Sequence, residues 1–270
     1  DDGSCVGPCT GPFVPYWTYP QETLNPLDGQ YNFELALYLN YGVDDIHPNT
    51  GDVGRFKTGF ACPVTELILV NKKICDLSGL EAFTNLTKLD VSSNGRHSVN
   101  FDCEIEILPT SALPLLEYID ASENSISKFG FDFTNNTQLR HLDLAGSLMY
   151  VAGSSSWGFH ECAVEMDLSQ NTLLEHLDLH SNFIADLDLS TNVGNLTYLD
   201  VSTGYNSNFY GPSGCGMGFG GLINTCGPIN VNLGHNIDLN NLTLIAGGWK
   251  TPNMTIQVGS ASRVTLGNGL

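Results

Sequence analysis

Acidic and histidine side chains recur at fixed places in short apolar segments of this sequence, and they are its best candidates for binding chemistry. Five segments end an apolar run on Leu-Asp or Ile-Asp, as in TKLDVSSN and EHLDLHSN. The aspartates are Asp90, Asp120, Asp143, Asp178 and Asp200, and two places before them stand Lys88, Tyr118, His141, His176 and Tyr198. Because alternate residues of a strand share a face, we expect two neighbouring rows on one exposed face.

The aspartate row limits the chemistry that this face could perform. Like charges about 4.8 Å apart repel one another unless cations, hydrogen bonds or water relieve them. Neighbouring strands would also place two histidine–aspartate pairs close enough to share a metal ion, His141 with Asp143 and His176 with Asp178. His180 extends the second of these strands. A solvated polar face is the alternative, and the sequence leaves any metal site undetermined.

Signatures of catalysis and of nucleic-acid binding are missing from the sequence. It contains no G-x-S-x-G, H-E-x-x-H, P-loop or dinucleotide-binding motif. Nothing singles out one acid as a proton donor, so we predict that the chain is not an enzyme. With 29 acidic and 10 basic residues, the formal net charge is -19. This charge disfavours nucleic acid and anionic lipid, and no apolar run predicts membrane insertion. Basic proteins, neutral glycans and divalent cations remain as partners.

The segments that carry these residues repeat along the chain. The pattern L-x-x-L-x-L-x-x-N, in full or degenerate form, starts at Val64, Leu86, Leu116, Leu139, Leu174, Leu196 and Leu239, with spacings of 22, 30, 23, 35, 22 and 43 residues. A second motif (apolar, Asp or Asn, apolar, small, any residue, Asn) occurs as FDFTNN, MDLSQN, LDLSTN and VNLGHN, from Phe131, Met166, Leu187 and Val231. A base period of about 22 residues with two extended segments predicts a flattened solenoid whose alternating apolar residues face inward.

Asparagines close both motifs, and we expect them to form internal ladders that hydrogen-bond the backbone of the turns. The first row is Asn94, Asn124 and Asn182, and the second is Asn136, Asn171, Asn192 and Asn236.

The run MDLSQNTLLEHLDLHSNFIADLDLSTNVGNLTYLDVS, which begins at Met166, is the most specific part of the pattern. It resembles bacterial cell-surface and secreted leucine-rich-repeat proteins, including internalin-like ones, and the resemblance covers about residues 64–247. It implies a leucine-rich-repeat solenoid with a parallel β-sheet on the concave face and second short strands or turns on the convex side. About seven coils are expected, and recognition is the role that the resemblance implies.

The flanking segments lack the repeat. Residues 1–63, with the strand-like run YNFELALYL, are expected to form an N-terminal cap or arm, because exposed solenoid ends must be covered. Residues 64–247 form the predicted solenoid, and residues 248–270, with the strand-like runs MTIQV and RVTL, form the predicted C-terminal cap.

Three insertions interrupt the period, over residues 95–108, 148–165 and 205–230. They share one phase of the repeat and should therefore emerge on one rim, which is often a binding face. They contain Arg96, His97, Tyr150, Trp157, Phe159, His160, Tyr205, Phe209 and Tyr210. Aromatic side chains among small polar residues suit contact with protein or glycan. A satellite core beneath the loops is the alternative.

Eight cysteines without a C-x-x-C pair predict disulfides rather than zinc binding, and hence an extracellular or cell-surface location. Sequence neighbours suggest Cys5–Cys9, Cys62–Cys75 and Cys215–Cys226, which leaves Cys103 with Cys162. Possible N-glycosylation sites are Asn85, Asn135, Asn195, Asn241 and Asn253. The chain starts at Asp1 without a signal peptide, so we expect a processed chain or a fragment.

Two functions compete on this evidence. The first is an extracellular recognition or adhesion protein that binds a protein or glycan through the insertion rim or the concave face. The second is a structural subunit that stacks into a filament or surface layer through its solenoid ends. We expect no required cofactor. Ca2+ is possible at the oxygen-rich run DDIHPNTGD, residues 44–52, although a turn is the simpler interpretation.

Overall fold

The computed structural model describes the chain in separate stretches, most of them in the repeat region. They are residues 33, 36–37, 61–74, 76–94, 105, 107–124, 126–127, 130–149, 166–182, 186–192, 195–201, 230–233, 243–245 and 255–257.

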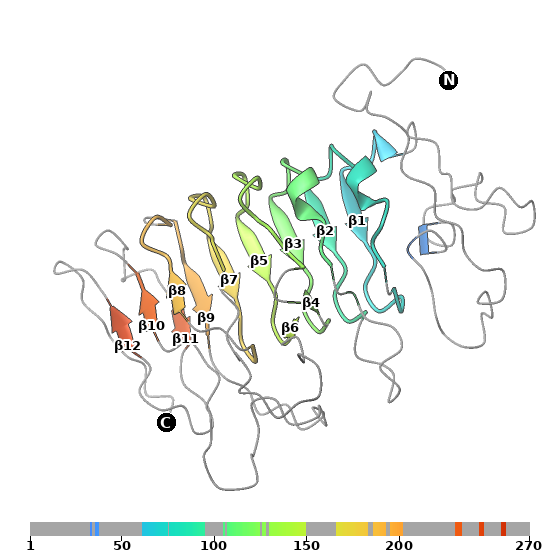
Figure 1. The fold of residues 1–270 in the computed structure, drawn as a ribbon. Helices are drawn as coiled ribbons and strands as arrows, with labels where there is room; N and C mark the ends of the chain where they lie inside the picture. The colour runs from blue at the N-terminus through green and yellow to red at the C-terminus, as the bar shows by residue number, and fades with distance from the viewer. Residues whose placement is uncertain are drawn as a thin grey trace, which may run out of the picture.

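Seven short strands pair in parallel to form one sheet, called here the main sheet, in the order β1-β2-β3-β5-β7-β9-β11. The strands are β1 (Glu66–Ile68), β2 (Lys88–Asp90), β3 (Tyr118–Asp120), β5 (His141–Asp143), β7 (His176–Asp178), β9 (Tyr198–Asp200) and β11 (Thr243–Ile245). Figure 1 shows β1, β2, β3, β5, β7 and β9 side by side, from cyan to orange. A stack of parallel strands, one from each sequence repeat, fits a leucine-rich-repeat solenoid. The total number of coils stays a prediction.

The central residue of each strand forms the spine of the core. Leu89, Leu142, Leu177 and Leu199 are all 0% exposed, and they occupy one register position across β2, β5, β7 and β9. The expectation of one buried leucine column is therefore confirmed. The flanking residues of each strand point the other way because side chains alternate.

The predicted register of β11 is wrong by two residues. The pattern that begins at Leu239 would put Thr243 in the aspartate row. The structure instead pairs Thr243 with Tyr198 and Ile245 with Asp200. A slip of two residues keeps the same side chains on the inner face. The apolar alternation of LNNLTLIAG therefore could not distinguish the two registers.

A second sheet is built from the second motif. It contains β8 (Asp186–Asp188), β10 (Asn230–Asn232) and β12 (Thr255–Gln257), paired in parallel in the order β12-β10-β8. Leu187 and Val231 are partners in it, as two extended segments per repeat predicted. The run MTIQV adds β12 to the same sheet. Two shorter strands, β4 (Ile126–Ser127) and β6 (Leu148–Met149), form a separate pair. Two 3-10 helices, η2 (Leu80–Ala82) and η3 (Thr110–Ala112), also lie in the early repeats.

The chain turns sharply after the main-sheet strands, one residue before the asparagine position. Ser93, Glu123 and Ser181 have φ values of 59, 56 and 59°, and Gly146 has 60° at the equivalent place. This left-handed conformation is unfavourable for residues with a Cβ atom. The side-chain hydrogen bonds of the next residue hold the turn in place.

The first asparagine row forms the predicted ladder. Asn124 Oδ1 accepts from Asn94 N at 3.1 Å, and its Nδ2 donates to Val91 O at 3.0 Å and Ala121 O at 2.8 Å. Ser147 replaces asparagine in the next repeat, where its backbone N donates to Asn182 Oδ1 at 2.9 Å.

The second row is also internal, but it uses only half of each amide. Nδ2 of Asn136, Asn171 and Asn192 donates to two backbone carbonyls in each case. The three Oδ1 atoms are buried and have no hydrogen-bond partner. Both rows are thus structural, and Asn236 lies outside the described residues.

The strand-like interpretation of YNFELALYL is wrong at the positions that the structure describes. Phe33, Ala36 and Leu37 are helical and buried, and the Phe33 ring lies edge-on to Phe83 at 6.0 Å. Their spacing of three and four residues places them on one helical face. The alternation of Phe33, Leu35 and Leu37 imitated a strand.

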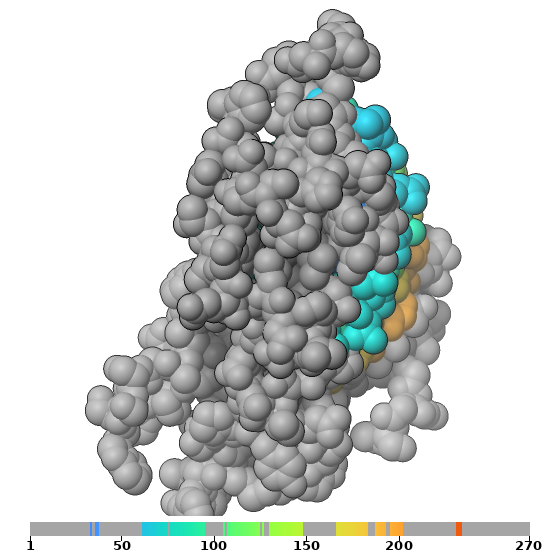
Figure 2. Space-filling model, turned by 90° about the vertical axis from the view of Figure 1, so that its right-hand side faces the viewer, coloured from blue at the N-terminus to red at the C-terminus, as the bar shows by residue number. Residues whose placement is uncertain are grey.

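Several predictions fall largely or wholly outside the described residues. All nine candidate residues of the insertion rim do, as does the run at 44–52. Among the cysteines only Cys62 is described, and it is buried, so the disulfide pairs stay predictions. No helix of the described part is long and apolar enough to span a membrane. Figure 2, viewed from the side of β1, shows the described repeats as a strip of cyan, teal and orange atoms.

Three possible glycosylation asparagines are described, and all use their side chains within the fold. Nδ2 of Asn85, Asn135 and Asn195 donates to Cys62 O, Ser111 O and Thr172 O, respectively, at 2.8 to 3.0 Å. Bridging to the preceding repeat explains why asparagine recurs there. Glycosylation itself stays a prediction.

Candidate functional site

The outer face of the main sheet, which the sequence places on the concave side, carries four stacked rings. Tyr118, His141, His176 and Tyr198 lie at one register position on β3, β5, β7 and β9. Successive ring centroids are 4.2, 4.1 and 4.2 Å apart, with interplanar angles of 8, 10 and 3°. We call these residues the ring stack. In-register parallel strands impose this spacing, because it is close to the distance between neighbouring strands.

A cation already lies at one end of the ring stack. Nζ of Lys88, from β2, is 4.7 Å from the centroid of the Tyr118 ring. This distance is typical of a cation–π contact. The sequence placed Lys88 in the same row but gave no sign of its contact with a ring.

The two imidazoles of the ring stack are uncharged near neutral pH. Burial, followed by the neighbouring His176, lowers the pKa of His141 to about 4. Burial also lowers the pKa of His176. The pKa values of Tyr118 and Tyr198 are raised, first by burial and then by nearby aspartates. The ring stack therefore offers neutral groups that can both donate and accept hydrogen bonds.

The aspartate row (Asp90, Asp120, Asp143, Asp178 and Asp200) runs beside the ring stack at the end of each strand. Oδ1 of the first four accepts the backbone N–H two residues later, at 2.9 to 3.2 Å. Ser92 and Ser122 also donate their hydroxyl groups to Asp90 and Asp120, each at 2.7 Å. These contacts are Asx turns, so the row also shapes the chain where it leaves the sheet.

Burial, and after it the neighbouring carboxylates, raises the pKa of two aspartates in the row. Burial raises the pKa of Asp143 to about 6, against the Ala145 N–H, and the charges of Asp120 and Asp178 raise it further. Burial likewise raises the pKa of Asp120, against its hydrogen bonds from Ser122. A nearby cation would stabilise the ionised form of both groups. The aspartate row therefore favours the binding of a positively charged group.

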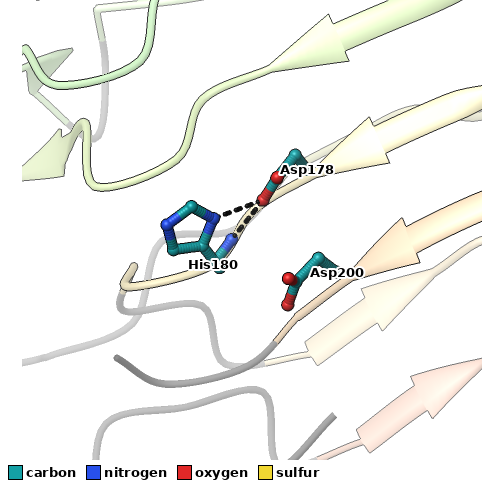
Figure 3. A group of neighbouring side chains, drawn as sticks. All are labelled: Asp178, His180 and Asp200. Atoms are coloured by element: carbon teal, nitrogen blue, oxygen red, sulfur yellow. Dashed lines mark hydrogen bonds and ion pairs between the residues drawn. The ribbon is translucent and has the colours of Figure 1, made fainter. Parts of the chain in front are cut away.

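Three side chains at the β7 and β9 end of the aspartate row come together (Figure 3). Nδ1 of His180 is 2.7 Å from Oδ1 of Asp178, and Asp200 lies on the adjacent strand. One ligand atom from each residue lies within 4.8 Å of the others. The four residues suggested for a shared metal, His141, His176, Asp143 and Asp178, do not form such a group. Stacked rings point their nitrogen lone pairs into parallel planes, which do not converge on one ion.

Comparisons with known proteins add one observation. No family model matches the sequence, and no curated protein does either. An internalin (InlF) from Listeria monocytogenes aligns with 90% of this chain and 60% of its own, at 19% identity and a TM-score of 0.45. The functional domain of InlJ from Listeria monocytogenes aligns with 74% and 57%, at 18% identity and a TM-score of 0.30. Both structures are Listeria internalins.

Internalins are also the proteins that the repeat motif of the sequence resembles. The chain spans about 60% of the length of each structure that it matches. At these scores the assignment of the solenoid rests on the strand pairing and the buried leucine column of this chain.

Proposed function

We propose that the chain is a non-enzymatic recognition protein of the extracellular space or cell surface. On this proposal, the outer face of the main sheet binds a protein partner with a basic surface. The observation that carries the proposal is the ring stack lying beside the aspartate row. Aromatic side chains are enriched at protein interfaces, and a row of carboxylates selects and steers a positively charged partner.

The ring stack complements a basic partner for two reasons. Its imidazoles are neutral, so they do not repel an incoming lysine or arginine. The rings are also held in place by one another, since each stacked aromatic pair contributes about 0.5–1.5 kcal/mol. A surface that is rigid before binding loses little conformational entropy when a partner arrives.

The net charge of -19 supports the same choice of partner. Acidic proteins attract basic ones over long distances, and opposed rows of charge then fix the orientation of the complex. The insertion rim stays a second predicted contact, and assembly into a filament stays the alternative function.

The experiment compares two double variants with the same change in charge. Asp120→Asn/Asp143→Asn removes two carboxylates from the aspartate row. Asp132→Asn/Asp167→Asn removes two from the second motif, away from the main sheet. Binding of a short arginine-rich peptide is measured by calorimetry at pH 7.5, with EDTA present and at two salt concentrations.

The proposal predicts that the variant in the aspartate row weakens peptide binding more than about tenfold, or about 1.4 kcal/mol. The variant in the second motif should change binding by less than about threefold. Equal effects of the two variants would show that only overall charge attracts the peptide, and would overturn the assignment of the binding face.

A further inference from the structure

We propose that Asp178, His180 and Asp200 form a binding site for one divalent transition-metal ion, of which Zn2+ is the probe. This inference does not depend on the proposed function. It follows from one imidazole and two carboxylates that each offer a ligand atom within 4.8 Å of the others (Figure 3).

The topology explains why these groups meet. Asp178 and Asp200 are direct partners in the parallel pairing of β7 with β9. His180 is two residues beyond Asp178, on the same side of the extended chain. Equivalent places two residues after the aspartate hold Ser92, Ser122 and Ala145 in other repeats. Among the repeats that the structure describes at this position, the β7 repeat alone has a nitrogen ligand two residues after its aspartate.

The chemistry of the donors selects the class of ion. One imidazole nitrogen with two carboxylate oxygens suits Zn2+ and neighbouring divalent transition metals, whereas Ca2+ takes only oxygen ligands. Zn–N and Zn–O bonds of about 2.0–2.2 Å place tetrahedral ligands about 3.3 Å apart. The ligand atoms now lie within 4.8 Å of one another, so binding of the ion on this proposal requires the side chains to rotate toward it.

The surroundings also favour an ion. Asp178 and Asp200 are only 9% and 8% exposed, so their charges are poorly screened by water. The backbone N–H of His180 holds Asp178 Oδ1 at 3.0 Å, which fixes that carboxylate in the way that second-shell contacts do in metal sites. The His180 side chain is 40% exposed, and this open side gives an ion a route from solvent.

A purely structural role for His180 is the competing explanation. Its ring hydrogen-bonds Asp178 at the same 2.7 Å distance as the hydroxyl groups of Ser92 and Ser122 bond their aspartates. The substitution His180→Ser separates the two roles. It replaces the imidazole by the hydroxyl that the other repeats use, so the turn keeps its hydrogen bond while the nitrogen ligand is lost.

The experiment titrates Zn2+ into the full chain by calorimetry after treatment with EDTA and removal of the chelator. A Co2+ spectrum checks for nitrogen coordination. His180→Ser and Asp200→Asn are compared with Asp132→Asn, which removes a carboxylate from the second motif but not from the proposed site. Far-UV circular dichroism and thermal unfolding in EDTA establish that all variants are folded.

We expect one Zn2+ per chain at this site, with affinity reduced more than about 100-fold by His180→Ser. Asp200→Asn should also weaken binding, and Asp132→Asn should leave it unchanged. Absence of Zn2+ binding, or binding that is unchanged in His180→Ser, would overturn the proposal. Tight Ca2+ binding without Zn2+ binding would also overturn it, because the imidazole would then have no part in the site.

Discussion

Replacing Asn124 by alanine should destabilise the fold about three times as much as the same substitution at Asn171. The two side chains are equally buried, at 1% and 0% exposed. The two substitutions differ in whether they leave a buried hydrogen-bonding group without a partner. Asn124 Oδ1 is the acceptor for the backbone N–H of Asn94. Asn171 Oδ1 has no partner to lose.

The backbone carbonyls that accept from Asn124 Nδ2 and Asn171 Nδ2 keep another hydrogen bond in both variants. Val91 O and Ala121 O keep hydrogen bonds from Asn94 Nδ2 and Ser147 Oγ when Asn124 is removed. In the second row, Phe133 O and Asn136 O keep the backbone N–H groups of Asn136 and Leu139 when Asn171 is removed. Only Asn124→Ala therefore leaves a buried donor without a partner.

The magnitudes follow from these contacts. An unsatisfied buried N–H costs about 1–3 kcal/mol, and each lost hydrogen bond contributes about 0.5–1.5 kcal/mol. Asn171→Ala loses two hydrogen bonds but also removes a buried oxygen that has no partner, which offsets part of the loss. We expect Asn124→Ala to lower the free energy of unfolding by about 3 kcal/mol and Asn171→Ala by about 1 kcal/mol. Urea denaturation with unchanged m-values is the assay. Equal losses, or a loss below about 1 kcal/mol for Asn124→Ala, would refute the distinction between the two ladders.

Three further predictions test the core, the aspartate row and the cysteines. Leu177→Ala should cost about 2–5 kcal/mol in urea denaturation, because it leaves a cavity in a column that is 0% exposed, and a smaller loss would contradict tight packing there. The fold raises the pKa of Asp143 from 3.8 to about 6, so the contribution of this group to stability is present below pH 4 and is lost as the pH rises through 6. Asp143→Asn, measured in EDTA at pH 7, should then be about 1 kcal/mol more stable than the parent after allowance for solvent screening, and the difference should vanish near pH 4. Asp132→Asn is the control with the opposite sign, since hydrogen bonds from Thr134 lower the pKa of that aspartate. Finally, thiol labelling of the unreduced, denatured chain should find no reactive cysteine, and labelled thiols would contradict the predicted disulfides.

Period and alternation were enough to predict the main sheet. Buried leucines repeated every 22 residues or so, and they fix which side chains share a face, so the ring stack and aspartate row could be placed from β2 to β9. The same logic failed at β11, where a two-residue slip changes the strand partners but not the buried face. It also failed at Phe33, where helical and strand spacings overlap.

The sequence could not show how the side chains of one row would meet. His141 and His176 stack with an interplanar angle of 10°, and this arrangement depends on rotamers that no pattern encodes. His180 stands two residues after Asp178, where Ser92 and Ser122 stand in other repeats. The sequence placed Asp178 and Asp200 in one row, but only the structure shows that a ligand atom of His180 lies within 4.8 Å of ligand atoms of both.

Recognition through the outer face of the main sheet can be tested directly by nuclear magnetic resonance of the seven histidine side chains. Resonances of His141 and His176 are assigned with His141→Gln and His176→Gln, and the arginine-rich peptide is then added. The account predicts that these two imidazoles shift, because a partner seated on the ring stack and aspartate row changes their environment. Peptide binding that leaves both resonances unchanged would contradict it.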